Sequence, residues 1–386
     1  MSTIKVNAIK NTSTDDGGIA IDNSGHVQID GQQLATAGAL SNRNLIINGA
    51  MTVAQRGTGN FPIGDDDFPV DRFLFSNVGS GFTGGANGTQ STTAPNGFKN
   101  SLEVDVTTAD TSLTSDSQGK IEYRVEGNDS AHLNWGTANA QTVTLSFYIK
   151  SNVTGESAVA FVNESNNRSY VATFNINTAN TWERKELTVA GPTDGTWNTS
   201  NGIGIRLRWG SFGSSFQTTS TNQWLSTQKM TSGSSINFFT STDNNLFLTG
   251  VQLELGQKAT PFEHRSYGDE LARCQRYYYR HADRNSDEGR SVGNVALYQS
   301  SRCFGAVHFP VTMRATPTLD ASDFTNAFKC FANANNQGFE GFAGIQETGT
   351  TSCVLESDST LSLTAGAAGW VRCEGSTAQL SFNAEL

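Results

Sequence analysis

The tryptophans of this chain are the residues best suited to bind a sugar. A pyranose lays its apolar CH face on an aromatic ring, while nearby amide and carboxylate groups bond its hydroxyls. Trp197 and Trp224 lie in the polar sequences DGTWNTSNG and TNQWLST, so we take them as the glycan-stacking candidates. Trp182 and Trp209 fall in strand-like sequence and are expected in the core, and burial is the alternative for every tryptophan because Trp is highly buried on average. The six tryptophans are Trp135, Trp182, Trp197, Trp209, Trp224 and Trp370.

A run of three aspartates, Asp65, Asp66 and Asp67, is the candidate metal site. Calcium prefers carboxylate and carbonyl oxygens, so its occupant would be a structural calcium ion. The alternative is a solvated acidic turn between Gly64 and Phe68. We favour the turn, because the sequence lacks the Asp-x-Asp-x-Asp-Gly pattern of a calcium loop. No other cofactor is expected.

Motifs for catalysis are missing from the sequence. Glycosidases need two carboxylates that face each other across a cleft, and nothing in the sequence marks such a pair. The five histidines have neither a G-x-S-x-G partner nor an H-E-x-x-H run. We therefore expect a protein that is not an enzyme. A glycan depolymerase is the alternative, because its site is assembled from distant strands and leaves no local motif.

Composition narrows the classes of protein and partner. Charged residues make up 16% of the chain, below the ~25% usual for soluble domains, and 39 glycines favour short strands and turns. The net charge of −10 argues against nucleic acid as a partner, since phosphate binding needs a basic face. No apolar run approaches the ~18 residues that span a bilayer, so membrane insertion is not expected. The first residues, MSTIKVNAIKN, lack the apolar core of a signal peptide, so ordinary secretion is not indicated.

The cysteines all lie in the last third of the chain and form no close pair, which excludes a zinc knuckle and a redox CxxC motif. An odd number of cysteines without a signal peptide predicts reduced, buried thiols in a protein made in a cytosol. A disulfide between chains, formed after release from the cell, is the alternative. The five are Cys274, Cys303, Cys330, Cys353 and Cys373.

The middle of the chain is a series of short strand-like segments. No amphipathic helix separates them, so the pattern predicts an antiparallel β-sandwich rather than a βαβ sheet. The segment around Val143, Leu145, Phe147 and Ile149 alternates apolar residues with Thr, Ser, Tyr and Lys, which is typical of a strand with one buried face. We expect strands at 101–106, 120–127, 141–151, 157–163, 169–176, 181–190, 202–210 and 246–255.

The first forty or so residues are too polar to fold alone. Two short alternations, Ile19/Ile21 and Val27/Ile29, flank the turn sequence Asp22-Asn23-Ser24-Gly25, which indicates a β-hairpin. A single hairpin is marginal in water, so we expect this segment to pair with other copies of itself or with a partner protein. A frayed terminus is the alternative.

The sequence changes character after the last of these strands. Pro261 ends regular pairing, and Ser266 with Asp269 three residues later predicts the start of a helix. Apolar residues then recur at helical spacings of four, three and four, so we expect a connector helix over 266–280 with this face turned inward. The face consists of Tyr267, Leu271, Cys274 and Tyr278. Residues 281–386 read as a second, smaller β-domain.

Several segments together resemble bacteriophage tail-fibre and related virion proteins. They are NLIINGAMTVAQRG, DRFLF, LTGVQLELG, TPFEHRSYGDELARCQRYYYR and HFPVTMRATPTL, and they lie between about Asn44 and Leu319. The resemblance implies an all-β homotrimer with a virion-attachment segment at 1–43, a jelly-roll β-sandwich similar to carbohydrate-binding modules at 44–265, the connector helix at 266–280 and a distal tip at 281–386. In such a trimer the helix would meet its symmetry mates, with Asp269, Glu270 and Arg273 pairing between chains.

The function that follows from this resemblance is host adsorption. We expect a structural virion protein, assembled in the host bacterial cytoplasm, that recognises a bacterial surface glycan or an outer-membrane protein with its distal domain. One alternative is a tailspike-like enzyme that depolymerises glycan, although the sequence lacks the repeats of a long β-helix. The other is a fibre or decoration protein placed elsewhere on the virion.

Overall fold

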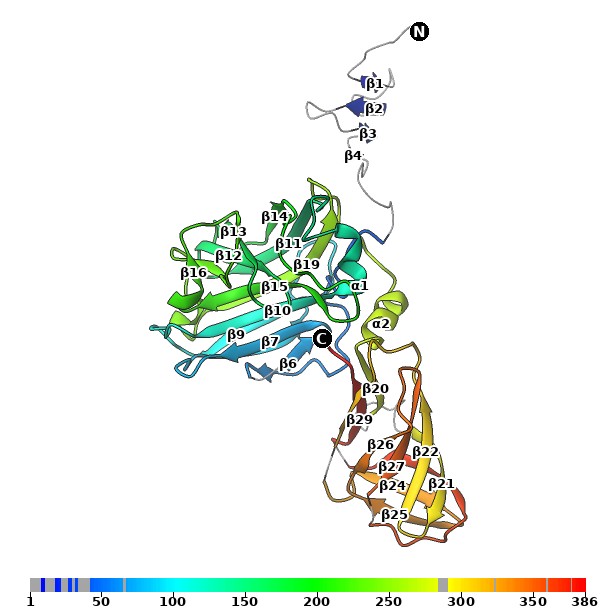
Figure 1. Cartoon of the computed structure of the whole chain (residues 1–386). Helices are drawn as coiled ribbons and strands as arrows, with labels where there is room; N and C mark the ends of the chain where they lie inside the picture. The colour runs from blue at the N-terminus through cyan, green and yellow to red at the C-terminus, as the bar shows by residue number, and fades with distance from the viewer. Residues whose placement is uncertain are drawn as a thin grey trace, which may run out of the picture.

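The computed structural model consists of a small N-terminal sheet, a β-sandwich and a distal β-domain, arranged in that order from one end of the molecule to the other (Figure 1). Strands dominate, and the antiparallel sheets confirm the predicted all-β fold. In the part of the chain that the structure describes, no helix has the length and apolar character needed to cross a membrane. The described residues are 8–10, 18–21, 27–29, 32–33, 42–64, 67–283, 291–322, 324–358, 360–375 and 377–386.

The sandwich is built from a seven-stranded and a six-stranded sheet, in the orders β17-β13-β12-β15-β10-β7-β6 and β14-β11-β19-β9-β8-β5. Each of the eight strands predicted here is found. A short parallel pair, β16 and β18, lies beside them. The bounds are β5 Phe61–Pro62, β6 Asp67–Val70, β7 Phe73–Val78, β8 Gly85–Ser91, β9 Ser101–Thr108, β10 Gln118–Glu126, β11 Val143–Ser151, β12 Gly155–Val162, β13 Ser169–Ile176, β14 Glu183–Val189, β15 Ile203–Phe212, β16 Gln217–Thr218, β17 Trp224–Leu225, β18 Thr231–Ser232 and β19 Asn245–Leu255.

Both faces of several sandwich strands are covered. Phe147 of β11 is fully buried in the core as predicted, but Thr144 on the opposite face is also buried, and its hydroxyl donates to the carbonyl of Gly256 (2.9 Å). On the other sheet, Val162 packs with Met230 from the long connection between β15 and β19. Loops therefore close over faces that simple alternation predicted to be exposed, because a sandwich of this size has connections long enough to fold back on it.

The distal domain contains a three-stranded sheet, β20-β29-β23, and a seven-stranded sheet, β25-β24-β28-β21-β22-β27-β26. Strands β21 and β22 form an antiparallel hairpin, in which Ala296 pairs with Phe304. All five cysteines are buried as predicted, and none is paired with another cysteine of the same chain. The bounds are β20 Tyr278–Asp283, β21 Ser291–Gln299, β22 Arg302–His308, β23 Thr318–Ala321, β24 Phe328–Ala332, β25 Asn335–Phe339, β26 Phe342–Gln346, β27 Ser352–Ser357, β28 Ala368–Cys373 and β29 Gln379–Asn383.

The connector helix α2 (Tyr267–Gln275) joins the two domains. Ser266 caps it as predicted, because its hydroxyl accepts a hydrogen bond from the Asp269 backbone N–H (3.2 Å). The helix ends before the expected 280, since Tyr278–Asp283 pairs with β29 and aromatic residues favour strands. A second helix, α1 (Gly127–Ser130), and 3-10 turns at Ala131–Leu133, Ser214–Phe216 and Phe238–Thr240 complete the fold.

The N-terminal sheet contains β1 (Ala8–Lys10), β2 (Gly18–Ile21), β3 (Val27–Ile29) and β4 (Gln32–Gln33). Pairing of Ile19 with Ile29 and of Ile21 with Val27 confirms the predicted hairpin, although its turn lies outside the described residues. Strands β1 and β4 extend it on both edges. Ile19 and Ile21 are 44% and 46% exposed, so this sheet presents apolar surface at the end of the molecule opposite the distal domain (Figure 1).

Candidate functional site

The predicted glycan-stacking residues Trp197 and Trp224 lie together, and Trp135 packs between them. The ring centroids are 4.9 Å apart for Trp135 and Trp197, and 5.4 Å apart for both Trp135–Trp224 and Trp197–Trp224. All of these contacts are edge-to-face. Tyr170 adds a further ring 5.3 Å from Trp224. We call Trp135, Trp197, Trp224 and Tyr170 the sandwich cluster.

Each indole of the sandwich cluster is also anchored to the backbone. The indole N–H of Trp135 donates to the backbone carbonyl of Gln141 (2.8 Å), that of Trp197 to the carbonyl of Asp194 (3.2 Å), and that of Trp224 to the carbonyl of Ala190 (2.7 Å). Trp135 is 7% exposed, and the other two indoles are half-buried. The three indole rings therefore pack mainly against one another and against the sandwich. Sugar stacking on Trp197 and Trp224 stays a prediction.

The distal domain carries a different aromatic arrangement. Phe331 on β24 and Trp370 on β28 are directly opposite each other across the ladder. Their rings stack with centroids 4.3 Å apart and planes 7° from parallel, and Trp370 is 40% exposed. Stacking covers one face of each ring, and the exposed part of Trp370 is the apolar surface on which a sugar ring could lie. We call Phe331 and Trp370 the distal platform.

Amide side chains flank the distal platform on both sides. The cross-strand neighbour of Phe331 is Asn336, and that of Trp370 is Asn294, so these amides share the outer face of the sheet with the rings. The turn at 333–335 and residues 368–370 complete a hollow of about 380 Å³ beside the platform. Amides can donate to and accept from sugar hydroxyls, so the hollow combines an apolar wall with orienting polar groups.

Two cations border the same rings. The Arg372 guanidinium carbon lies 4.9 Å from the Phe331 ring centroid and 5.8 Å from that of Trp370, and the Lys329 ammonium lies 5.9 Å from Phe331. Glu374 contacts both cations, at 2.8 Å from Arg372 Nε and 3.6 Å from Lys329 Nζ. The hydrogen bond from Arg372 holds the pKa of the Glu374 carboxyl below its usual range, so this carboxylate is ionised at neutral pH.

Sequence reasoning did not single out the distal platform. Trp370 stood among six tryptophans, and its strand sequence GWVRCEG favoured burial. The signal was the alternation of Trp370 and Arg372 with Val371 and Cys373, because the latter two are buried and the former two point outward. The contact with Phe331 depends on the register of β24 and β28, which are far apart in sequence.

The predicted connector residues are divided between buried and exposed positions. Cys274 is fully buried against Ile47 and Val53 of the sandwich, with Leu271 packed beside them. Tyr278 is buried but belongs to β20, and Tyr267 is 62% exposed in the single chain. The trimer contact stays a prediction. The inward face of the helix is thus shifted from the predicted one, because the chain leaves the helix before Tyr278.

Tyr277, which sequence reasoning missed, is buried at the same junction. Its hydroxyl donates to Glu126 of the sandwich (2.7 Å), and Arg276 donates to the same carboxylate (2.7 and 3.1 Å). Burial raises the pKa of Glu126, but the hydrogen bonds from Arg276 and Tyr277 outweigh it and hold that pKa below its usual range. An ionised carboxylate therefore ties the distal domain to the sandwich.

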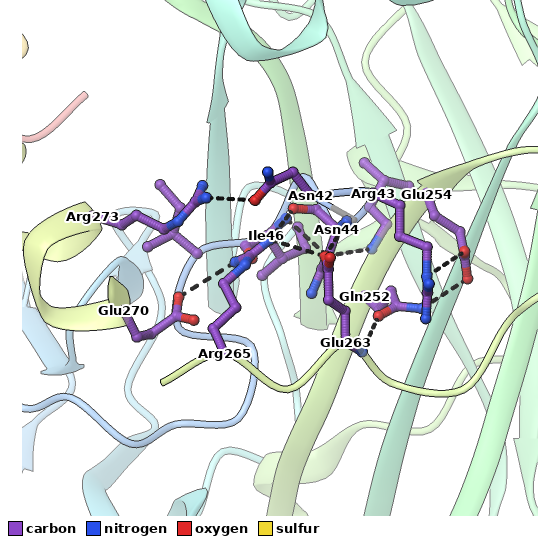
Figure 2. Close-up of polar contacts among 12 residues, drawn as sticks. Asn42, Arg43, Asn44, Ile46, Gln252, Glu254, Glu263, Arg265, Glu270 and Arg273 are labelled. Carbon is purple, nitrogen blue, oxygen red and sulfur yellow. Dashed lines mark hydrogen bonds and ion pairs between the residues drawn. The ribbon is translucent and has the colours of Figure 1, made fainter. Parts of the chain in front are cut away.

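Figure 2 shows how residues 42–46 are tied to this junction. Arg265 donates to the carbonyl oxygens of Asn44 (2.5 Å) and Ile46 (3.0 Å), and Arg273 donates to the Asn42 side chain (2.8 Å). Glu270 pairs with Arg265 (3.6 Å) and is largely buried. Glu270 is thus engaged within its own chain rather than free to pair with a neighbouring one. Residues 42–46 therefore contact the end of the sandwich chain at 251–265 and the connector helix at one place.

Two of the three aspartates of the candidate metal site lie outside the described residues. Asp65 and Asp66 lie outside the described residues, and Asp67 is the first residue of β6. Within the described part of the chain, no group of three or more His, Cys, Asp or Glu side chains is arranged to hold a metal ion. The calcium prediction is therefore left untested.

Comparisons with known proteins find distant likenesses. No protein-family model matches the sequence, and no curated protein matches it. The enzymatically active domain of tailspike protein 4 of bacteriophage CBA120 matches with 11% identity and a TM-score of 0.29, over 55% of this chain and 21% of that chain. The family 11 carbohydrate-binding module of a cellulosomal cellulase of Clostridium thermocellum matches with 13% identity and a TM-score of 0.26, over 53% and 98% of the two chains. At these TM-scores neither likeness carries an argument about function.

Proposed function

We propose that this chain is a bacteriophage virion fibre that binds a bacterial surface glycan through the distal platform and does not cleave it. The observation that carries the proposal is the stacked, partly exposed pair of Phe331 and Trp370 with an amide on either side. Phe331 and Trp370 together form a contiguous apolar patch bordered by polar residues, and patches of this kind mark ligand-binding sites. A sugar ring is an occupant that uses both the ring face and the amides.

The arrangement of the molecule supports the fibre part of the proposal. The N-terminal sheet and the distal domain lie at opposite ends (Figure 1), so a chain anchored by residues 1–43 would hold the platform away from its anchor. The exposed Ile19 and Ile21 suit contact with other copies of the chain or with a virion protein. In a homotrimer, three platforms would compensate for weak individual binding through effective concentration.

The chemistry of the platform supports binding rather than cleavage. A glycosidase needs one protonated carboxyl as a general acid and a second carboxylate across the bond to be cut. Glu374, the carboxylate beside the platform, has a pKa below its usual range and is held by Arg372, so it is poorly suited to donate a proton. Stacking on Trp370 and hydrogen bonds from amides bind the sugar without activating its glycosidic bond.

The test compares the full-length chain with its Trp370→Ala variant. The wild-type chain should bind purified bacterial envelope polysaccharide and block adsorption of the virion, whereas the variant should lose about tenfold or more in affinity, as expected when a stacking ring is removed. Trp182→Ala is the matched control, since it removes a half-buried tryptophan of the sandwich. Equal binding by wild type and Trp370→Ala would sink the platform assignment.

Two further measurements separate the alternatives. Shorter fragments appearing when the polysaccharide is incubated with the wild-type chain would show a depolymerase and overturn the non-catalytic part. Immunogold labelling of virions decides between a tail fibre, which we propose, and a fibre or decoration protein elsewhere on the particle.

A further inference from the structure

A second aromatic pair lies on the same outer face as the distal platform. Tyr298 on β21 is 84% exposed, and its ring is 6.0 Å from that of Phe304 on β22. Val295 and Leu297 of β21 point into the core, so the alternating residues, including Tyr298, point outward. Asn294 is directly opposite Trp370, which fixes this outward face as the face of the platform. We call Tyr298 and Phe304 the second pair.

Small side chains lie between the two aromatic pairs. Ala296 is opposite Ala368 of β28 on one side and opposite Phe304 of β22 on the other. Trp370 and Phe304 are thus two strands and two residues apart, which is roughly 12 Å at the usual strand spacing and rise. Because alanine side chains are short, Ala296 and Ala368 do not obstruct a ligand that lies across the sheet between the two pairs. A ligand that contacts both pairs must be longer than one sugar ring.

The platform also carries a local excess of positive charge. Among the residues that the structure describes, Lys329 and Arg372 both pair with the carboxylate of Glu374, in a chain whose formal net charge is −10. Beside the second pair, Arg302 forms an ion pair with Glu356, whose backbone is opposite Phe304. Both cations at the platform are partly exposed, with 29% of the side-chain surface accessible for Lys329 and 36% for Arg372. Charge complementarity therefore favours an anionic ligand.

We infer that the ligand of this face is a linear polysaccharide carrying carboxylate groups, which crosses the sheet and stacks on both aromatic pairs. This inference rests on the proposed function and names the class of glycan. One uronic acid ring would lie against Trp370 with its carboxylate toward Arg372, and a later ring of the same strand would lie against Tyr298. A single terminal sugar would use one pair and leave the other exposed without a role.

The test titrates size-fractionated polygalacturonate, alginate and hyaluronate into the full-length chain at low salt. Neutral dextran and amylose and a glycerol-phosphate polymer are the controls. At least one acidic polymer should bind, and its affinity should rise about tenfold between short oligomers and hexamers because the second pair becomes reachable. Tyr298→Ala should remove that rise and leave short oligomers unaffected, whereas Tyr298→Phe, which keeps the ring, should retain it. Arg372→Gln should weaken acidic polymers severalfold and leave neutral ones unchanged.

The outcomes separate this inference from the proposed function. Binding that depends on Trp370 but is equal for neutral and acidic polymers, or unaffected by Tyr298→Ala, would overturn the linear acidic ligand and leave glycan binding at the platform standing. Lack of binding to all three acidic polymers would also overturn it, as would binding to a glycerol-phosphate polymer alone, because phosphate would then be the recognised group. Envelope polysaccharide binding that survives Trp370→Ala would instead contradict the proposed function itself.

Discussion

The sandwich cluster and the distal platform use the same kind of side chain in opposite ways. Trp135, Trp197 and Trp224 meet edge-to-face, and each indole N–H is bonded to a backbone carbonyl. Phe331 and Trp370 lie nearly parallel, and the pair remains partly open to solvent. The first arrangement packs its rings onto the core of the sandwich, whereas the second leaves part of Trp370 exposed to solvent. Packing geometry, rather than residue type, separates the tryptophans of the sandwich core from the one that we propose as a binding residue.

Sequence position misleads for these residues because loops fold back onto the domain. Trp197 and Trp224 lie in polar sequence, but Trp197 folds onto Trp135 and Trp224 pairs as strand β17 beside Tyr170, so both rings pack against the sandwich core. Trp370 lies in strand β28, where burial would be expected, but its side chain is on the outward face of that strand. The variants described next test the difference between the sandwich cluster and the distal platform by measuring stability and binding.

The largest effect is expected from Trp135→Ala. Trp135 is nearly buried within the sandwich cluster, so its removal leaves a cavity and should cost about 3–5 kcal/mol of unfolding free energy. Trp370→Ala should cost less, about 1–2 kcal/mol, because the variant loses the stack with Phe331 but leaves no enclosed cavity at a position that is 40% exposed. Chemical denaturation of both variants measures the difference. Similar losses in the two variants would mean that the distal platform is structural after all.

Leu271→Asp should have the next largest effect, at the junction between the two regions. Leu271 packs against the cluster of Ile47, Val53, Cys274 and Tyr277, and a carboxylate placed there would lose apolar contacts and be partly desolvated, for about 3 kcal/mol. The sandwich should stay folded while the distal domain becomes easier to cleave by protease. Tyr267→Asp is the control for position, since Tyr267 is exposed on the same helix.

Leu271→Asp and its control also test the trimer. If Tyr267 lies at a contact between chains, Tyr267→Asp should lower the oligomer mass measured by light scattering without exposing the distal domain to protease. An unchanged mass and an unchanged protease pattern for both variants would show that the connector helix has neither role.

The strands illustrate what the sequence can and cannot determine. The stretch 141–151 was predicted from its alternation, and β11 covers Val143–Ser151, because a period of two is set by backbone geometry alone. Burial on the outer face of a strand is harder to predict from the sequence. Thr144, for example, is buried by a segment more than a hundred residues away in the chain. The distal platform has the same origin, because the pairing of β24 with β28 is a property of the folded domain and is not encoded in either strand by itself.

The junction should also weaken in acid. The pKa of Glu126 is lower in the folded chain than its ordinary value, so its contribution to stability is present above about pH 4.5 and is lost as the pH falls through the folded value. Glu126→Gln should cost about 1.5–3 kcal/mol at pH 7, since charge-assisted hydrogen bonds from Arg276 and Tyr277 are weakened. The variant should then lose less additional stability between pH 5 and 3 than the wild type, as measured by denaturation across that range. A parallel decline of both proteins would place the acid sensitivity elsewhere.

The smallest effect is expected at the distal platform, from Glu374→Gln. Glu374 offsets part of the charge of Lys329 and Arg372, so its neutralisation should raise the affinity for an acidic polysaccharide about twofold, equivalent to ~0.5 kcal/mol, and leave neutral polymers unchanged. The gain should vanish at high salt, because the groups are exposed and screened. A fall in affinity would instead mean that Glu374 acts mainly by orienting Arg372 over the Phe331 ring. In that case ligand binding at the distal platform would depend on a fixed side-chain arrangement, as the packing of the sandwich cluster does. The two regions would then differ only in how far their aromatic rings are exposed to solvent.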